Sequence, residues 1–456
     1  MGHDCFGQPT SLETDIACRA WDQTQLAFLA HGAETPIHLG KVLQAEPQFA
    51  LGHAVKGLFY LLLGRRELYP TATQALSAAK AAARKGQISA RERGFVDALE
   101  AYLHGKPSQS VRHLEGVLRA HPDDPLAMKL SHAIRFVLGD GAGMRRSVER
   151  VLPSYAPDHK ARGYLLGCHS FALEETGDYA KAEIAGRQAL WMAPDDAWGL
   201  HAVAHVYDMT GDAAGGIDWL TGREAAWSHC NNFRYHVWWH KALMHLDLGQ
   251  IDTVFDLYDA QIRADQTDDY RDISNATSLL SRLELNGVDV GDRWEELADI
   301  SAKRTEDGCL IFADLHYLLA LIGGERDEAI ARMMARMQAD ASGMQDDLTQ
   351  RIADPGIAAS QGLHAFGEGD YAGAFRHLCD ARPTMRRAGG SHAQRDVFER
   401  LTIDAGLRAG RIDAAERILE DRKALRDGHE DGYTAARREL IAAARGAASS
   451  QQIPAQ

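Results

Sequence analysis

Hydrophobic residues recur along this chain at helical spacing, in apolar segments that short glycine-centred turns separate. Glycine in such a turn supplies the left-handed conformation that ends a helix. Alternating runs of β-branched residues, which would indicate strands, are nearly absent. The pattern predicts an all-α protein whose turns contain Gly32, Gly64, Gly105, Gly139, Gly177, Gly211, Gly249, Gly287, Gly323, Gly369 and Gly410.

The interval between these turns runs from 32 residues (Gly32 to Gly64) to 46 residues (Gly323 to Gly369). Intervals near 34 are typical of the tetratricopeptide unit, which is a pair of antiparallel helices. The clearest unit predicts helices over 163–176 and 179–192, joined at Gly177, with Asp196 capping the next helix.

We therefore expect an α-solenoid, or superhelix, of degenerate tetratricopeptide-like helix pairs. Residues 1–446 are predicted to form one continuous superhelix, and residues 447–456 a frayed tail. The interval 324–369 is the least regular and predicts a longer helix or an inserted loop near 338–345.

The segment from Trp191 to His245 holds six of the eight tryptophans and six of the 21 histidines. Four of these histidines form two i,i+4 pairs, which share one helix face. Both pairs fall on the first helix of consecutive units, here called A helices, which line the concave side of a tetratricopeptide array. The sequence thus predicts that His201, His205, His236 and His240 face one enclosed space, where two or three of them converge and act as catalytic or binding groups.

Three interpretations of these histidines stay open. Single helical histidines are usually packing residues. The spacing His-x3-His also suits a divalent metal such as zinc, although the motif His-Glu-x-x-His is not present. Without a metal, the imidazoles would serve as general acids or bases. The cofactor is therefore unknown.

Further ligand-binding candidates come from the same A-helix positions and from a glycine-rich loop entering a helix. Asp208 is placed to orient an imidazole, and Arg395 to clamp an anion. The competing interpretation is a set of i,i+4 ion pairs on a solvated face, Arg395 with Glu399 and Asp396 with Arg400. The full set is His132, Trp198, Asp208, Trp239, Asp314, His316, Gln394, Arg395 and Asp396.

Composition and charge narrow the classes of partner and the cellular location that we expect for this chain. The net charge of −14 and the absence of a basic stripe predict no nucleic-acid partner. No apolar run is long enough for a membrane helix. The N-terminus does not resemble a secretory signal, and the six cysteines form no Cys-x-x-Cys pair, so we expect a cytoplasmic protein. The oligomeric state is open, and a homodimer is compatible with the sequence.

The chain resembles the tetratricopeptide repeat protein 38 family over nearly its whole length. The matching residues are Gly52-His53-Ala54, Ser131-His132, Asp195-Asp196-Ala197-Trp198 with His201 and His205, His236 with Trp239-His240, Gly287-Val288, Gly291-Asp292-Arg293-Trp294, Asp314 with His316, Gly389-Gly390-Ser391 and Ala393 to Phe398. The resemblance implies an α-solenoid and places the four histidines and Gln394-Arg395-Asp396 in the family pattern. His169 and His392 depart from that pattern.

Two functions remain in competition. The first is a His/Trp-lined concave pocket for a small polar or anionic ligand, with acid–base or hydrolytic chemistry if it is an active site. The alternative is a scaffold that holds a protein or a short peptide in the groove without catalysis. The chain has no Gly-x-Ser-x-Gly, no phosphate-binding loop and no dinucleotide fingerprint, so any enzyme would be of the hydrolase, lyase or isomerase type.

Overall fold

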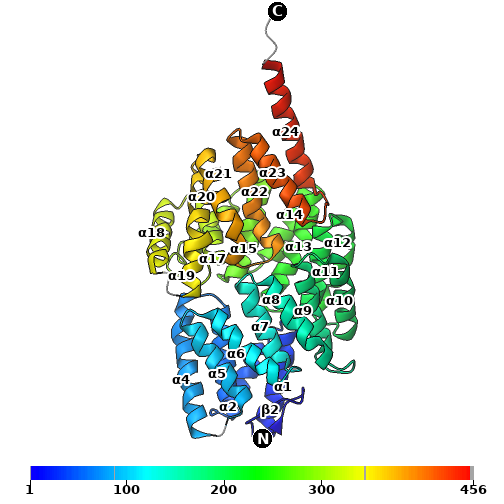
Figure 1. Ribbon diagram of the computed structural model, residues 1–456, viewed down its shortest axis with the longest axis vertical. Helices are drawn as coiled ribbons and strands as arrows, with labels where there is room; N and C mark the ends of the chain where they lie inside the picture. The colour runs from blue at the N-terminus through cyan, green and yellow to red at the C-terminus, as the bar shows by residue number, and fades with distance from the viewer. Residues whose placement is uncertain (1, 87, 344–345, 452–456) are drawn as a thin grey trace, which may run out of the picture.

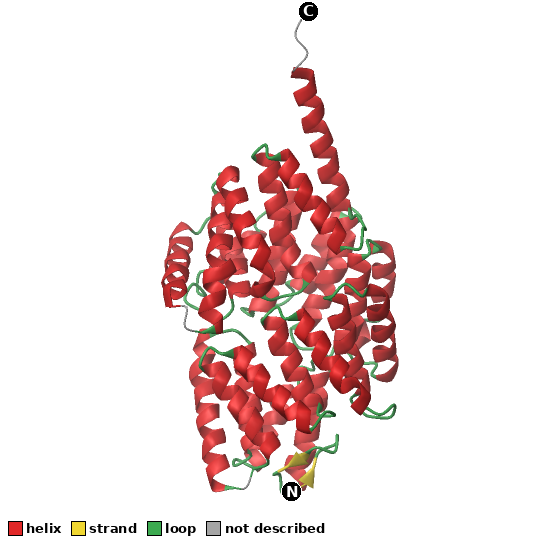
Figure 2. Cartoon of the chain, viewed as in Figure 1, coloured by secondary structure: helices red, strands yellow, loops and turns green. Residues whose placement is uncertain are grey.

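The computed structural model describes residues 2–86, 88–343 and 346–451, and these residues are almost entirely helical (Figures 1 and 2). The first half of the chain forms α1 (Asp15–Leu29), α2 (Thr35–Ala45), α3 (Ala50–Leu62), α4 (Tyr69–Lys85), α5 (Ala90–Leu103), α6 (Pro107–Ala120), α7 (Pro125–Val137), α8 (Gly141–Val151), α9 (Arg162–Glu174), α10 (Tyr179–Met192), α11 (Ala197–Met209) and α12 (Ala213–Leu220).

The second half continues as α13 (Phe233–Asp247), α14 (Ile251–Leu257), α15 (Tyr270–Leu285), α16 (Arg293–Ser301), α17 (Ile311–Gly323), α18 (Asp327–Gly343), α19 (Asp347–Arg351), α20 (Ile357–Gly367), α21 (Tyr371–Ala381), α22 (His392–Arg408), α23 (Ile412–Leu425) and α24 (Gly432–Gln451). Two short antiparallel strands, β1 (Gly2–His3) and β2 (Pro9–Thr10), precede them. The all-α solenoid prediction is confirmed.

The unit that the sequence marked most clearly has the predicted form. α9 ends near Gly177, whose φ of 81° is left-handed, and α10 has the predicted bounds. Asp196 caps α11, because its carboxylate accepts a hydrogen bond from the backbone N–H of Gly199 at 3.1 Å.

Two of the predicted turn glycines do not take the left-handed conformation. After α1, the residue with the left-handed conformation is His31 (φ 59°), one position before Gly32. After α17 it is Glu325 (φ 56°), because that helix extends through Gly323. The other predicted turn glycines all have positive φ.

The irregular interval contains the predicted longer helix, α18, followed by the short α19; residues 344–345 of the predicted loop lie outside the described residues. The predicted tail, residues 447–456, is described only in part. α24 continues to Gln451 and projects from the body (Figure 1), and residues 452–456 lie outside the described part.

Contacts between distant repeats close the superhelix on itself. The backbone N–H of Asn231 donates to the carbonyl of His31 at 2.8 Å, next to an isolated bridge between Gly32 and Cys230. Farther on, Arg304 pairs with Glu67 at 2.6 Å. The turn after α1 and the start of α4 therefore lie against the middle of the chain.

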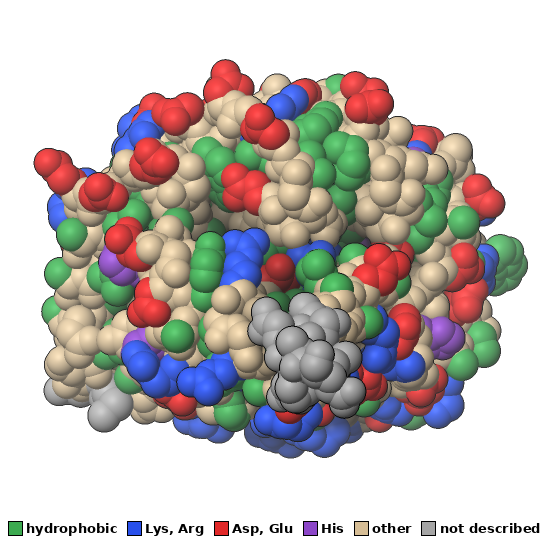
Figure 3. Space-filling model, turned by 90° about the horizontal axis from the view of Figure 1, so that it is seen from above, with side chains coloured by type: hydrophobic (Ala, Val, Ile, Leu, Met, Phe, Trp, Pro, Cys, Tyr) green, Lys and Arg blue, Asp and Glu red, His purple; other side chains and the backbone are tan. Residues whose placement is uncertain are grey.

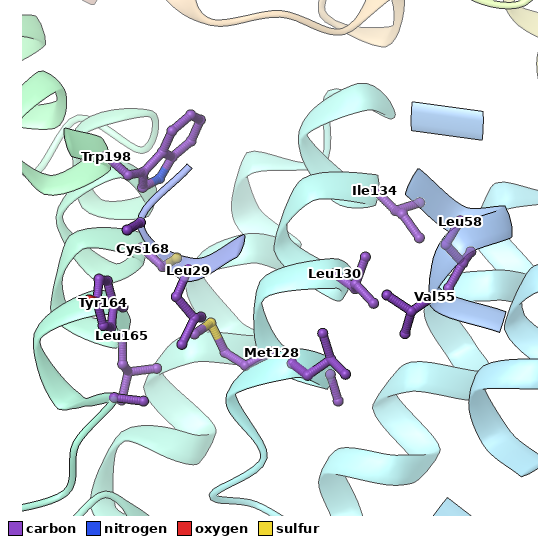
Figure 4. Close-up of a cluster of buried hydrophobic side chains, with 14 of the residues drawn as sticks. Leu29, Val55, Leu58, Met128, Leu130, Ile134, Tyr164, Leu165, Cys168 and Trp198 are labelled. Atoms are coloured by element: carbon purple, nitrogen blue, oxygen red, sulfur yellow. The ribbon is translucent and has the colours of Figure 1, made fainter. Parts of the chain in front are cut away.

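The interior divides into two large hydrophobic clusters, one running from Phe6 to Met244 and the other from Trp239 to Leu401. In the first, Leu130 and Ile134 on α7 face Val55 and Leu58 on α3 (Figure 4). The two clusters meet at α13. No helix in the described ranges is long and apolar enough to cross a membrane.

Candidate functional site

A cavity of about 930 Å³ lies inside the closed superhelix. A helices supply most of its wall, with further residues from α2, the N-terminal ends of α15 and α17, and the loop before α22. One side is apolar and includes Leu39, Leu43, Phe59 and Leu63. From above, the upper face is hollowed at its centre, with hydrophobic and charged side chains around the hollow (Figure 3).

The four predicted histidines meet in one cluster, here called the histidine cluster. Nε2 of His205 lies 2.9 Å from Nε2 of His201, and Nε2 of His240 lies 3.2 Å from Nε2 of His236. Across α11 and α13, the His205 and His240 rings are 4.3 Å apart between centroids. One nitrogen of each histidine lies within 4.8 Å of those of the other three, so the cluster could hold a metal ion.

Partners on the far side of the rings orient three of the imidazoles. Nδ1 of His201 lies 3.3 Å from the carbonyl oxygen of Trp198. Nδ1 of His236 lies 2.9 Å from Oδ1 of Asn275, and Nδ1 of His205 lies 3.5 Å from a carboxylate oxygen of Glu174.

Burial sets the charge of the cluster. It lowers the pKa of His201 and His240 well below the usual value and that of His236 to about 3. Burial alone would also lower the pKa of His205, but the carboxylates of Glu174, Glu175 and Asp208 together outweigh burial and raise that pKa, with Glu174 contributing most of the three. Three of the imidazoles are therefore neutral at pH 7, and neutral imidazole is the metal-ligating form.

Glu174 was not among the residues predicted from the sequence. It is fully buried on α9, and neither carboxylate oxygen has a hydrogen-bond partner among the described residues. The sequence feature that could have identified Glu174 is its position. It stands three residues before the turn glycine Gly177, on the A helix that precedes the A helix carrying His201.

Of the predicted ligand-binding residues, three line the cavity: His132, Trp198 and Gln394. His132 is 3% exposed, and neither of its ring nitrogens has a partner within the described residues. His31 and Lys129 also line the cavity, and neither was among the residues predicted from the sequence. His31 stacks on Trp198 at 5.4 Å, a contact between turns of the superhelix that local spacing does not reveal.

Two predicted residues sit behind the wall. Trp239 is fully buried and stacks on His236 at 5.2 Å, so it supports the histidine cluster from the core. His316 is also fully buried, and its Nδ1 lies 2.7 Å from the carbonyl oxygen of Phe312. Neither side chain lines the cavity.

Three predicted carboxylates pair with arginines elsewhere instead of facing the cavity. Asp208 lies beside Arg426, Asp314 pairs with Arg336 at 2.9 Å, and Asp396 pairs with Arg422 at 2.6 Å. The expectation that Asp208 orients an imidazole is corrected, because Asp208 pairs with the guanidinium group of Arg426 and Glu174 is the carboxylate beside His205.

Arg395 does not reach into the cavity as an anion clamp. It pairs with Glu175 at 3.2 Å and donates to the carbonyls of Gly389 and Gly390, which do line the cavity. The alternative pair with Glu399 is not formed either, since Glu399 pairs with Arg382. Arg395 therefore holds the loop that forms part of the wall.

Charge in the cavity wall has the opposite sign to that of the whole chain. Four cationic residues line it, against the single carboxylate of Asp269: Lys56, Lys129, Arg234 and Arg271. Arg271 and Asp269 neutralise each other at 2.6 Å. Lys129 is 3% exposed; its ammonium group contacts Sγ of Cys168 at 3.7 Å, and its charge lowers the pKa of the buried Asp196 carboxyl group, which burial raises. Arg234 pairs with Asp265 at 3.2 Å, outside the wall, so Lys56 and Lys129 are the lining cations for which no ion pair is found among the described residues, in a protein of net charge −14.

No family model matches the sequence. Among solved structures, the chain is similar to a human IFIT1 dimer with m7Gppp-AAAA, at 14% identity and a TM-score of 0.39, over 96% of each chain. A second, the human IFIT1 dimer with PPP-AAAA, has 13% identity and a TM-score of 0.40, over 94% of this chain and 95% of that chain. Similarity at this level concerns the tetratricopeptide-like helical fold and no individual residue.

These two structures correct the expectation that nucleic acid is excluded as a partner. One of them holds m7Gppp-AAAA and the other PPP-AAAA, and a likeness at this level does not show what this chain binds. The physical reason is that net charge sums the whole surface, whereas an anion responds to the local field of the groove that it enters.

Proposed function

We propose that the cavity binds a small organic anion, with the anionic group near Lys129 and the apolar part against α2 and α3. The observation that supports this most is the presence of lysine side chains in the wall of a concave cavity of an acidic protein. Cavities of this volume suit small molecules, and their few polar groups set the orientation of the ligand.

The unpartnered polar atoms favour a ligand group beside Lys129. Nζ of Lys129 lies 5.1 Å from the centre of the Trp198 ring and 3.7 Å from Sγ of Cys168, and neither neighbour neutralises its charge. His132, which lies one turn farther along α7, leaves both ring nitrogens free to donate or accept. A carboxylate or phosphate would satisfy these groups, and burial of unpaired polar groups is otherwise unfavourable.

The test uses octanoate, 3-phenylpropionate and phenyl phosphate as probes, with the corresponding primary amides as neutral controls for the carboxylates. We expect calorimetry to detect at least one anion that binds about tenfold more tightly than its neutral counterpart, the discrimination expected of one charge-assisted contact. Lys129→Met should abolish that difference, because methionine keeps the apolar stem and removes the charge.

Lys181→Met is the matched control, because Lys181 lies on the outer helix α10 and its side chain is 69% exposed. It should leave anion binding unchanged. Equal affinity for the anions and the amides, or equal loss in both variants, would refute an anion site at Lys129.

Two other possibilities belong to the same experiment. A short peptide with a free C-terminal carboxylate tests the scaffold alternative, and a 5′-triphosphorylated oligoadenylate tests the corrected expectation about nucleic acid. If the bound ligand is turned over, His201 and His236 are the members of the histidine cluster that reach the cavity. An acid–base or hydrolytic reaction would begin there.

We further propose that the protein belongs with the tetratricopeptide repeat protein 38 family, whose pattern includes the residues of the histidine cluster, and that it acts in the cytoplasm. The roles of Asp208, Trp239, Asp314, His316, Arg395 and Asp396 follow from their contacts. They position other groups or stabilise the fold, and the ligand contacts fall to His132, Trp198 and Gln394.

A further inference from the structure

We propose that the histidine cluster is a binding site for one divalent transition-metal ion of the zinc type, at the floor of the cavity. Imidazole nitrogens bind zinc at about 2.0–2.1 Å, so neighbouring ligand nitrogens of a tetrahedral site lie roughly 3.3 Å apart. The two i,i+4 pairs have Nε2–Nε2 distances of 2.9 and 3.2 Å, and all four nitrogens fall within 4.8 Å of one another.

The hydrogen-bond partners decide which nitrogen carries the proton. Oxygen acceptors lie 3.3 Å from Nδ1 of His201 and 2.9 Å from Nδ1 of His236, which favours a proton on Nδ1 in both rings; a carboxylate oxygen of Glu174 lies 3.5 Å from Nδ1 of His205. The Nε2 lone pairs of His201 and His236 then face Nε2 of His205 and Nε2 of His240. Facing lone pairs repel each other, and either a cation between them or a proton on one of the facing nitrogens removes the repulsion.

A shared proton is the rival explanation. An imidazolium at His205 would donate to Nε2 of His201 and relieve that pair. Nδ1 of His240 has no hydrogen-bond partner among the described residues, so a neutral His240 could carry its proton on Nε2 and donate it to Nε2 of His236. A divalent ion would instead accept a lone pair from all four rings, so a measurement of bound metal distinguishes the two explanations.

The surroundings supply what a metal site requires. Glu174 stands behind His205 as the carboxylate that orients a ligating imidazole and offsets part of the charge of the ion. Four imidazoles select ions such as zinc, copper, nickel and cobalt over magnesium and calcium, which prefer oxygen. Because His201 and His236 line the cavity whereas His205 and His240 lie deeper, the ion would sit where a ligand in the cavity can approach it.

The experiment loads the full chain with zinc chloride, removes loosely bound ion by dialysis and measures zinc by elemental analysis. We expect about one retained ion per chain, a rise in the midpoint of thermal unfolding, and X-ray absorption with four nitrogen neighbours at about 2.0–2.1 Å and the scattering pattern of imidazole. Loss of the retained zinc is expected for His205→Ala and for His240→Ala.

His316→Ala is the matched control, since His316 is an equally buried A-helix imidazole outside the cluster. It should retain zinc. Glu174→Gln should retain it with affinity reduced by about 10–100-fold, as for other carboxylates that support a ligating histidine. Circular dichroism verifies that each variant is folded.

Wild-type protein that retains no zinc, copper, nickel or cobalt would overturn the site, as would a first shell that lacks imidazole. The absorption measurement on wild-type protein needs no variant, so it decides the question even if an alanine variant fails to fold. The outcome is separate from that of the anion proposal, because Lys129→Met removes the anion contact and leaves the four ligands in place.

Discussion

Asp396 shows how a single residue of the predicted site became part of the framework. Burial alone would raise the pKa of its carboxyl group, but the guanidinium groups of Arg422 and Arg400 outweigh burial and hold that pKa well below its usual value. A carboxylate with a lowered folded-state pKa stabilises the fold above its ordinary pKa of about 3.9, and the contribution is lost as the pH falls below it.

Asp396→Asn should therefore lower the free energy of unfolding by about 3 kcal/mol at pH 7, because it leaves buried guanidinium charge without its partner. Between pH 5 and 3 the wild type should lose more stability than the variant, so the two curves approach each other in acid. Urea unfolding across this range measures both effects, with the exposed Asp252→Asn as the control that changes neither. Parallel curves would contradict the assignment.

At the scale of elements, the position of the histidine cluster depends on how closely α9 approaches α11. A Cβ atom at Gly167 would lie 1.9 Å from Oδ2 of Asp196, the residue that caps α11. α11 carries His201 and His205, and α9 carries Glu174. The absence of a side chain at position 167 is thus what lets the carboxylate and the imidazoles meet.

Gly167→Ala is expected to lower the free energy of unfolding by about 2 kcal/mol, since overpacking in a tight interface typically costs 1–3 kcal/mol. It should also weaken zinc retention, because α11 must shift. Gly116→Ala on α6 is the opposite case: its nearest neighbour, Nη2 of Arg119, is 3.6 Å away, so alanine should stabilise by about 0.5–1 kcal/mol. Denaturant titrations compare the two; the same sign for both would refute the packing argument.

At the scale of the whole molecule, contacts between repeats that are far apart in sequence enclose the cavity. Arg304 pairs with Glu67, which lies 237 residues away at the start of α4. It also pairs with Asp268, which lies in the middle of the chain as Arg304 does. The ordinary contacts of a solenoid join neighbouring repeats only. The contacts that close the superhelix therefore contribute to the stability of the fold separately from the packing of neighbouring helix pairs.

Arg304→Met should lower the free energy of unfolding by about 1–2 kcal/mol, between the values for exposed and buried ion pairs. Its distinctive effect should be faster amide hydrogen exchange in α3 and α4, because the first turn loses its tie to the middle of the chain. Arg293→Met is the control: Arg293 pairs with Asp259, only 34 residues away, at 2.7 Å. Faster exchange confined to the vicinity of residue 304 would argue against closure.

Local spacing in the sequence was sufficient for the helix pairs, most of the turns and the two i,i+4 histidine pairs. Each depends on residues only a few positions apart, so helical periodicity and turn chemistry determine them. The bounds of α10 and the cap at Asp196 follow from the same short-range rules.

The tertiary structure alone decided which side chains share the cavity. Lys129 and His31 come from different turns of the superhelix, and their meeting in the cavity wall depends on its curvature and closure, as does the contact of Glu174 with His205 behind the wall. Small changes in the angle between helix pairs accumulate over many repeats, so no local pattern encodes the final position. For the same reason, Asp208 and Arg395 found partners on distant helices, and the charge of the cavity wall could not be inferred from the net charge of the chain.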